Sequence, residues 1–338
     1  IMYSIIMSSV ATGTIITMTS HHWLLAWIGL ELNTLAIIPI IAKQHSPRAT
    51  EATTKYFLTQ AAASATILFA STVNAWHTGT WDISQLTNQP ACTLLTMALA
   101  MKLGLAPLHF WLPEVLQGST LKTALIIATW QKLAPATLLY LVYNTTNPTI
   151  LLTMGILSTL VGGWGGLNQT QTRKIMAFSS VANLGWMATI LTINPNIMLL
   201  NLALYIIMTA PLFLTLMLTS SKTMKDLTTT WTVSPPTTAM LLMLLMSMGG
   251  LPPLTGFTPK WLILQELTTH NLTATATILA LSALLSLFFY LRLSYTSTLT
   301  VFPTTTKSAH KWRFQPKLST APMATTTALS LLLLPMTP

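Results

Sequence analysis

The chain is a succession of long apolar stretches separated by short polar ones. A helix that crosses a membrane needs about 20 mostly apolar residues, because it must span the hydrocarbon core. By that criterion the 338 residues contain about eleven stretches. They are Ile1–Ser20, Trp23–Ala42, Ala52–Trp76, Ala91–Trp111, Leu121–Tyr143, Thr149–Leu167, Ile175–Ile193, Ile197–Thr219, Thr238–Glu266, Leu272–Leu291 and Ala321–Leu334. With no long hydrophilic stretch between them, we predict one all-α, polytopic membrane domain over 1–338.

Two of these stretches carry glycines and prolines where a continuous helix would not tolerate them. They are Gly104–Pro113 and Gly250–Pro259, and a shift of 146 residues superposes five of their ten positions. The matched pairs are Gly104 with Gly250, Leu105 with Leu251, Pro107 with Pro253, Leu108 with Leu254 and Pro113 with Pro259. An interior proline removes a backbone hydrogen bond, which a membrane protein accepts only inside protein or beside water.

The two matched stretches lie five segments apart, so a chain that crosses the membrane at each segment runs through them in opposite directions. Opposed repeats with interrupted helices are typical of ion transporters. We therefore predict an inverted repeat with two Pro-broken helices. Its halves are roughly 1–145 and 146–300, followed by a C-terminal helix over 321–334. Ordinary proline kinks are the alternative.

The composition supports a membrane protein. Hydrophobic residues make up 52% of the chain and charged residues only 7%, whereas soluble domains carry about 25% charged residues. Lys and Arg number 16 against 6 Asp and Glu, for a net charge of +10. Nucleic-acid binding would require these bases to cluster on one face. They are scattered between apolar runs, so we expect lipid rather than nucleic acid as a partner.

If each predicted segment crosses the membrane once, the basic residues between the segments all fall on one side of it. One set of loops holds thirteen bases, and the opposite loops hold none. The thirteen are Lys43, Arg48, Lys55, Lys122, Arg173, Lys174, Lys222, Lys225, Arg292, Lys307, Lys311, Arg313 and Lys317. Lys and Arg are retained on the cytoplasmic or matrix side during insertion. This rule predicts that the N-terminus lies on that side.

Four charged residues remain inside apolar segments: Glu31, Lys102, Lys132 and Lys260. Each charge near the bilayer centre costs roughly 2.5–3.5 kcal/mol on insertion scales. Snorkelling from a helix end, or a structural Glu–Lys pair, is the plain explanation, and it is strongest for Lys260. The functional explanation is a proton relay, because low dielectric disfavours a charged lysine and a nearby carboxylate favours it.

Other chemistry is sparse. His109 follows Pro107 closely and is either a further relay residue or a packed, hydrogen-bonded histidine. Cys92 is the single cysteine, which excludes a disulfide framework, a Cys-ligated iron–sulfur cluster and the usual structural zinc site. We predict no cofactor-binding residues, no metal ligands and no redox centre in this chain.

Several long motifs resemble those of a known family. They include His22–Trp27, Glu51–Gln60, Lys102–Pro107, Trp111–Gly118, Gly162–Lys174 and Gly249–Glu266. Across essentially the whole chain the sequence resembles the antiporter-like membrane subunits of NADH:ubiquinone oxidoreductase, respiratory complex I, in their vertebrate mitochondrial form. These subunits are related to multisubunit cation/proton antiporters.

The resemblance implies a role in proton translocation by a translocase. The family's Glu–Lys pair falls on Glu31 and Lys102, its second lysine on Lys132 and its third on Lys260. It also implies that NADH, FMN, iron–sulfur clusters and ubiquinone are bound by other subunits. The implied partners are the other core and accessory subunits of complex I and the lipid bilayer, including cardiolipin. The implied location is the mitochondrial inner membrane, with many passes and the N-terminus in the matrix.

Two alternatives belong to other functional classes. One is a stand-alone cation/proton antiporter, and the other is a structural scaffold that has lost pumping. Migration on a native gel after mild detergent extraction separates the first from a subunit. A very large band with NADH dehydrogenase activity indicates the subunit, and a small transport-competent oligomer indicates the antiporter.

Overall fold

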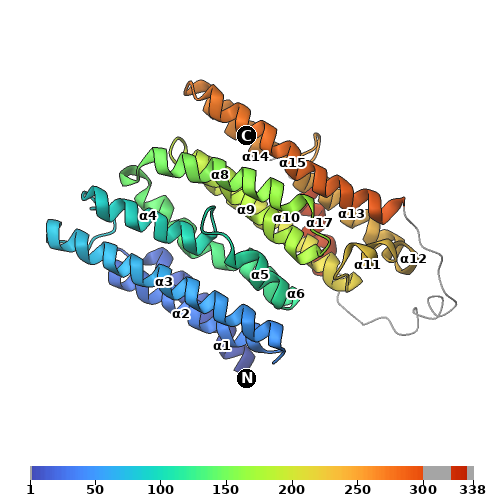
Figure 1. Ribbon diagram of the computed structural model, residues 1–338, viewed down its shortest axis with the longest axis horizontal. Coiled ribbons are helices and arrows are strands. Elements are labelled where there is room, and N and C mark those ends of the chain that lie inside the picture. Colours follow the sequence, from blue (N-terminus) through green and yellow to red (C-terminus); the bar gives the residue numbers. More distant parts are fainter. Residues whose placement is uncertain (1, 300–320, 333–338) are drawn as a thin grey trace. The chain divides into compact units, whose positions relative to one another are not determined.

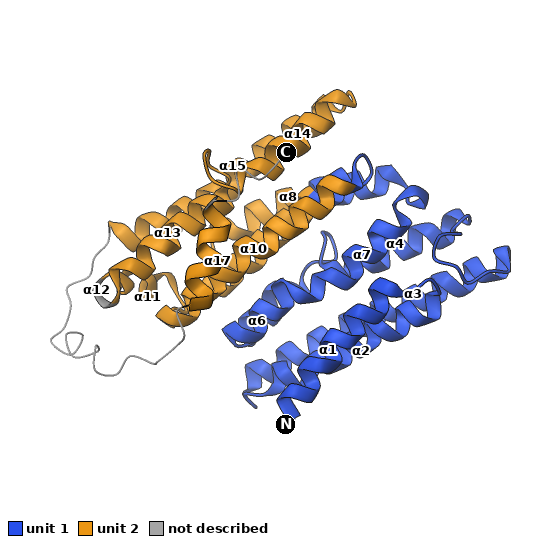
Figure 2. Ribbon diagram, turned by 180° about the vertical axis from the view of Figure 1, so that it is seen from behind, with its two compact units in different colours: residues 1–158, 187–195 blue, residues 159–186, 196–338 orange. Residues whose placement is uncertain are grey.

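The computed structural model describes residues 2–299 and 321–332, and every named element in these ranges is a helix (Figure 1). The chain divides into two compact units (Figure 2). Unit 1 comprises residues 1–158 and 187–195, and unit 2 comprises 159–186 and 196–338. Helices α8 and α9 contribute to both. The predicted all-α class of a polytopic membrane protein is confirmed, since eight helices are long and apolar enough to span a bilayer in the described residues.

Unit 1 contains the N-terminal helices. These are α1 Met2–Thr19, α2 Trp23–Ala42, α3 Pro47–Thr78, α4 Gln89–Leu103, α5 Trp111–Gly118, α6 Leu121–Ala128, the 3-10 turn η1 Trp130–Lys132, α7 Leu133–Val142 and the 3-10 turn η2 Tyr143–Thr145. Helix α3 contacts α2, α4 and α5, and α1 lies along α2. Close approach of α1 and α2 depends on glycine, because a Cβ on Gly29 would lie 2.6 Å from Thr17 Cγ2.

Unit 2 contains the remaining helices and parts of α8 and α9. They are α8 Pro148–Leu167, α9 Thr172–Leu191, α10 Pro195–Thr219, α11 Met224–Thr228, α12 Thr230–Val233, α13 Pro235–Gly249, α14 Phe257–Thr269, α15 Thr273–Thr298 and α17 Ala321–Leu332. Helix α15 contacts α11, α13 and α14, and α17 contacts α13. The Arg292 side chain on α15 donates to the Leu167 carbonyl at 2.5 Å, at the end of α8.

Both predicted helix breaks are present, and they share their local geometry. Helix α4 ends at Leu103 with Gly104 at φ 85°, and α13 ends at Gly249 with Gly250 at φ 80°. Glycine adopts this left-handed conformation without the steric cost that a Cβ imposes. A cis X–Pro peptide follows in each break, at Pro107 and at Pro253. The carbonyls near the breaks therefore need partners other than the next helical turn.

A third interruption was not predicted. The stretch Leu121–Tyr143 is divided into α6, η1 and α7, with the irregular backbone at Thr129 to Lys132. Pro135 explains it, because a proline offers no N–H to the carbonyl four residues earlier, and its ring crowds that carbonyl. The affected residue is Gln131. The signal was present in the sequence, and it leaves Lys132 at a discontinuity instead of inside a regular helix.

Other differences from the predicted segments concern boundaries. Helix α3 begins at Pro47 instead of Ala52, because Ser46 caps it by accepting the Ala49 N–H. The last predicted helix is observed to Leu332, and its remaining two residues lie outside the described part of the chain. Lys307, Lys311, Arg313 and Lys317 also lie outside it. The inverted halves at 1–145 and 146–300 stay a prediction.

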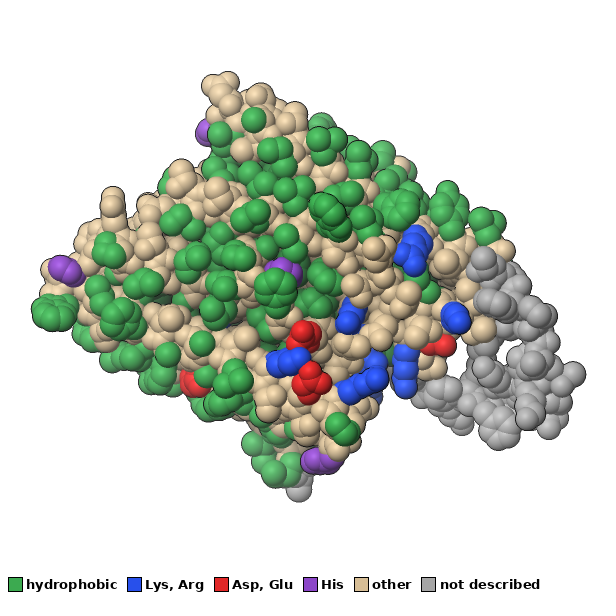
Figure 3. All heavy atoms as spheres, viewed as in Figure 1, with side chains coloured by type: hydrophobic (Ala, Val, Ile, Leu, Met, Phe, Trp, Pro, Cys, Tyr) green, Lys and Arg blue, Asp and Glu red, His purple; other side chains and the backbone are tan. Residues whose placement is uncertain are grey.

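The outer surface is suited to lipid. On the face drawn in Figure 3, hydrophobic and uncharged side chains cover most of the surface. Large apolar side chains point outward, including Trp76, Phe110 and Trp164. The many threonines are compatible with apolar surroundings because their hydroxyls donate to carbonyls of their own helix. An example is Thr17, which donates to the Thr14 carbonyl at 2.7 Å, so that little polarity remains unsatisfied.

Candidate functional site

Glu31 lies on α2, where its neighbours Leu30 and Leu32 belong to the apolar segment. The side chain is partly buried. Its Oε2 atom is buried and has no hydrogen-bond partner among the residues that the structure describes. A carboxylate oxygen shielded from solvent without a donor is costly unless water or a mobile group reaches it. This oxygen of Glu31 therefore lacks the donor that a structural hydrogen bond or ion pair would supply among the described residues.

Lys102 lies in the last turn of α4, directly before the first helix break. Only 6% of its surface is exposed, and its Nζ has no hydrogen-bond partner among the described residues. Glu31 is near enough to interact with it electrostatically. Among the described residues, no ion pair with an N–O distance of 4.0 Å or less joins Glu31 to Lys102. Glu31 and Lys102 are thus within electrostatic range of each other and form no ion pair among the described residues.

Lys132 occupies the end of the η1 turn, between α6 and α7, and is 3% exposed. Its position is set by the third interruption, where Thr129 has φ −114° and ψ −69°. An unwound turn inside an apolar helix exposes backbone carbonyls that a regular helix would occupy. Lys132 therefore lies at an interruption between two apolar helices.

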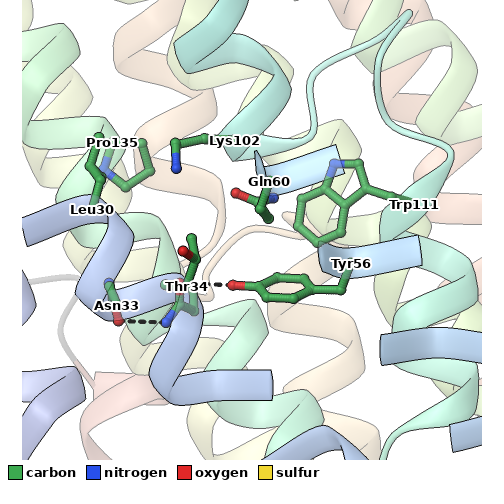
Figure 4. Close-up of a pocket in the computed structure, with 9 residues that line it drawn as sticks. Leu30, Asn33, Thr34, Tyr56, Gln60, Lys102, Trp111 and Pro135 are labelled. Atoms are coloured by element: carbon green, nitrogen blue, oxygen red, sulfur yellow. Dashed lines mark hydrogen bonds between the residues drawn. The ribbon is translucent and has the colours of Figure 1, made fainter. Parts of the chain in front are cut away.

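A small cavity with both polar and apolar lining lies within unit 1, and of the four charged candidates only Lys102 lines it (Figure 4). It is lined by Leu30, Asn33, Thr34, Tyr56, Gln60, Lys102, Trp111, Gln131 and Pro135. The space for the centre of a water molecule is about 10 Å³, close to the minimum for one bound water. Lys102 and Gln60 face this space in Figure 4. Gln60 Nε2 is also buried without a hydrogen-bond partner in the described part of the chain.

These unsatisfied donors determine what the cavity can hold. The ammonium of Lys102 and the amide of Gln60 both offer N–H groups, and a water oxygen accepts two hydrogen bonds. A bound water would therefore satisfy both groups and pass its own protons on to acceptors in the wall. The cavity is chemically suited to water-mediated proton transfer.

Lys260 belongs to unit 2, whereas the residues that line the cavity belong to unit 1. It is in the first turn of α14 and is partly buried. Its Nζ donates to the Gly249 carbonyl at 2.8 Å, at the end of α13. A Cβ on Gly250 would lie 2.9 Å from Lys260 Nζ, so the lysine runs closely across the break. A snorkelling lysine would extend its side chain toward a membrane surface. The Lys260 side chain instead reaches back to the end of α13.

The two breaks satisfy their free carbonyls in related ways. At the first, Trp111 Nε1 donates to the Met101 carbonyl at 3.1 Å. At the second, the donor is the charged Lys260 side chain. A positive charge at a helix C-terminus is also favoured by the helix dipole. At the second break the charged group, Lys260, therefore binds the end of α13. At the first break the charged group, Lys102, faces the cavity instead.

His109 is located in the first break, between α4 and α5, and is 4% exposed. Its imidazole is hydrogen-bonded to the Pro107 backbone, and its ring lies 4.4 Å from that of Phe110. It is not among the residues that line the cavity with Lys102. This local packing favours a role in shaping the break.

Four uncharged residues that line the cavity were not predicted: Asn33, Tyr56, Gln60 and Gln131. None of them carries the charge by which the other candidates stand out in apolar segments. Amides in such segments are themselves a signal, because an unsatisfied amide in hydrocarbon is expensive. Their convergence on one cavity could not be predicted, because they come from three separate segments of the chain.

Two families of known proteins together match residues 20–338 of the chain. The profile of the family described as NADH:quinone oxidoreductase/Mrp antiporter, TM, matches residues 20–286. That of the NADH dehydrogenase subunit 2 C-terminus matches residues 287–338.

Curated relatives named NADH-ubiquinone oxidoreductase chain 2 are similar over nearly the full length. The relative from Salmo salar is 60% identical over 335 residues, covering 99% of this chain and 96% of its own. The relative from Xenopus laevis is 56% identical over 338 residues, covering 100% of this chain and 98% of its own. Such identity over whole chains indicates the same family and not only the same fold.

Solved structures are similar as well. A chain of respiratory complex I from Thermus thermophilus with bound aureothin has a TM-score of 0.85 and 27% identity, covering 99% of this chain and 79% of its own. A chain of the Mrp complex from Dietzia has a TM-score of 0.83 at 16% identity, covering 97% and 73%, and supports the fold alone. With both family profiles and the close relatives in agreement, the chain belongs to the NADH-ubiquinone oxidoreductase chain 2 family of antiporter-like membrane proteins.

Proposed function

We propose that this chain is a membrane-arm subunit of NADH:ubiquinone oxidoreductase that transports protons through a relay of Glu31, Lys102, Lys132 and Lys260. The observation that carries the proposal is the buried Lys102 ammonium, which faces the unit 1 cavity without a hydrogen-bond partner among the described residues. A buried charge left unpaired is destabilising, so its presence calls for a function.

Chemically, the relay works by changing the cost of charge. Lys102 is charged most easily when the Glu31 carboxylate is near, because opposite charges compensate for lost hydration. If Glu31 is neutralised or drawn away, Lys102 loses that support and releases its proton through water toward Lys132. Lys260 in unit 2 would act as a terminal station, with its ammonium stabilised by the Gly249 carbonyl. His109 has the weaker case as a further relay, given its local contacts.

Redox chemistry is assigned to other subunits. NADH, FMN, iron–sulfur clusters and ubiquinone would be bound there, since this chain supplies one cysteine and cannot ligate a cluster with thiolates alone. The chain's contribution is then to accept energy from distant electron transfer and to move protons. The proposed partners are the other core and accessory subunits.

A lipid-exposed, multi-pass chain of this family is proposed to reside in the mitochondrial inner membrane. Cardiolipin is the proposed anionic lipid, because basic residues concentrate on one predicted side and attract anionic headgroups. A stand-alone antiporter has less support, since the close relatives are named as chains of an oxidoreductase. A small oligomer with transport activity and no NADH dehydrogenase activity on a native gel would favour that alternative.

The proposed function predicts a strong effect of Glu31→Gln, which keeps shape and removes charge. We expect the assembled complex to show strongly reduced NADH oxidation coupled to proton pumping, because Lys102 loses the carboxylate that helps it take up a proton. Pumping is measured as acidification driven by NADH in sealed vesicles, and assembly by native gel.

The matched control is Glu266→Gln, since Glu266 lies near the end of α14, outside the unit 1 cavity. This variant should pump normally. Full pumping by an assembled Glu31→Gln complex would instead leave Glu31 with only a structural role.

The membrane orientation gives a second prediction. Lys222 and His77 are exposed and belong to opposite sets of loops, and the single native cysteine, Cys92, is buried. In Lys222→Cys, a membrane-impermeant thiol reagent should label the chain only from the matrix side. In His77→Cys it should label only from the intermembrane side. Labelling of Lys222→Cys from the intermembrane side would reverse the proposed topology.

A further inference from the structure

Gln131 is held at both ends of its side chain inside the unit 1 site. Its Nε2 donates to Asn33 Oδ1 at 2.7 Å, and its Oε1 accepts from the Tyr56 hydroxyl at 3.5 Å. The dashed lines of Figure 4 mark these contacts from α2 and α3. Gln131 also lines the cavity that Lys102 faces, and it directly precedes Lys132. The amide therefore lies in the wall of the Lys102 cavity, one residue before Lys132 in the chain.

A carboxamide is a poor carrier of protons. Its N–H groups are donors that do not dissociate near neutral pH, and its oxygen accepts hydrogen bonds without becoming protonated. A hydroxyl group or a water molecule, in contrast, accepts a proton on one side while donating another. The contact between Asn33 and Gln131 thus joins α2 to the η1 turn with a hydrogen bond through which no proton can pass.

The contact is also easy to open. A neutral hydrogen bond of this kind contributes only about 0.5–1.5 kcal/mol, and the Tyr56 contact is at the long limit for a hydrogen bond. Gln131 belongs to the η1 turn and not to a regular helix, so its side chain is not fixed by a continuous helical ladder. Rotation of Gln131 away from Asn33 would leave both amides in need of partners, which water can supply.

We propose that the Asn33–Gln131 amide pair is a gate that separates the Lys102 cavity from Lys132. Closed, as in this structure, it insulates the two lysines. Open, with Gln131 turned away, it admits water beside the Tyr56 hydroxyl, and a proton crosses from one lysine to the other. Gln131 is a positioning residue in this arrangement and does not itself carry the proton. The inference rests on the proposed function, because it assumes that protons pass between these lysines.

The direct test is Gln131→Glu, which preserves the shape of the gate and makes it able to accept and release a proton. The assembled complex is placed in sealed vesicles, a pH gradient is imposed without NADH, and its decay is followed with a fluorescent pH probe. We expect decay severalfold faster than in the wild type, and fewer protons pumped per NADH oxidised. Gln265→Glu is the matched control, because it makes the same exchange at an exposed position of α14, outside the unit 1 site; its vesicles should stay proton-tight.

A second variant covers failure of the first to assemble. Asn33→Ala removes the acceptor of Gln131 without adding charge, and we expect it to accelerate the decay as well. Unchanged decay in both Gln131→Glu and Asn33→Ala would overturn the gate, as would equal leakage from Gln265→Glu. If Gln131→Glu does not assemble, Asn33→Ala decides alone.

The gate and the relay can fail separately. Full pumping by a Lys102→Met complex would contradict the proposed function, whatever the result with the gate variants. Loss of pumping in Lys102→Met together with proton-tight gate variants would leave the relay in place and reject the gate alone.

Discussion

Replacement of Lys102 by methionine is expected to abolish proton pumping while the complex still assembles. Methionine has similar length and no charge, so it fills the same space beside the cavity. The Nζ of Lys102 makes no hydrogen bond within the described residues, and a lysine at this depth costs roughly 2.5–3.5 kcal/mol. The variant should therefore be at least as stable to heat as the wild type.

This opposite behaviour of activity and stability is what separates a functional charge from a structural one. If Lys102 instead held the fold through an ion pair, its removal would leave the partner charge unpaired. The protein would then be destabilised by about 3–5 kcal/mol. Pumping in sealed vesicles and the melting temperature of the purified complex measure the two effects. Lys122→Met is the control, because Lys122 is exposed at the start of α6. Normal pumping by Lys102→Met would exclude Lys102 from the relay.

Replacement of Lys260 is expected to impair pumping whether or not its charge is kept. Arginine keeps the positive charge and can donate to the Gly249 carbonyl as Lys260 does, but it does not release its proton near neutral pH. Alanine removes both the charge and the hydrogen bond. If Lys260 passes protons, both Lys260→Arg and Lys260→Ala should lose most of the pumping driven by NADH.

Stability should separate the two Lys260 variants. A hydrogen bond from a charged donor contributes about 1.5–3 kcal/mol, so Lys260→Ala should lower the melting temperature more than Lys260→Arg. Lys225→Arg, at an exposed position in α11, controls for a general effect of the exchange. If Lys260→Arg pumps fully and Lys260→Ala does not, Lys260 anchors the helix break and is not a proton station.

Several features follow from local sequence and were predicted on that basis. The spans are encoded by runs of apolar residues, since lipid contact requires them along every turn. The breaks at Gly104 and Gly250 are encoded locally too, because glycine adopts the left-handed backbone and proline cannot continue the ladder. Glu31, Lys102, Lys132 and Lys260 stood out because charge is costly in an apolar segment, whatever the neighbouring helix is.

Prolines show where local information ends. Pro39 and Pro211 lie inside continuous helices, whereas Pro107, Pro253 and Pro135 accompany breaks. All of them remove a backbone donor, so the outcome depends on what is near the carbonyl that loses its partner. At the second break Lys260 reaches back to the Gly249 carbonyl from another helix. No pattern around the proline alone could predict that contact.

The sequence alone determined the membrane class, the positions of the two glycine–proline breaks and the identity of the buried charges. Each of these depends on a residue and its immediate neighbours. Only the tertiary structure decided that Asn33, Tyr56 and Gln131 meet around the Lys102 cavity, and that Glu31 approaches Lys102 without pairing with it. The physical reason is that hydrogen bonds between distant segments depend on how helices pack, and apolar packing surfaces in a membrane helix do not specify their partners.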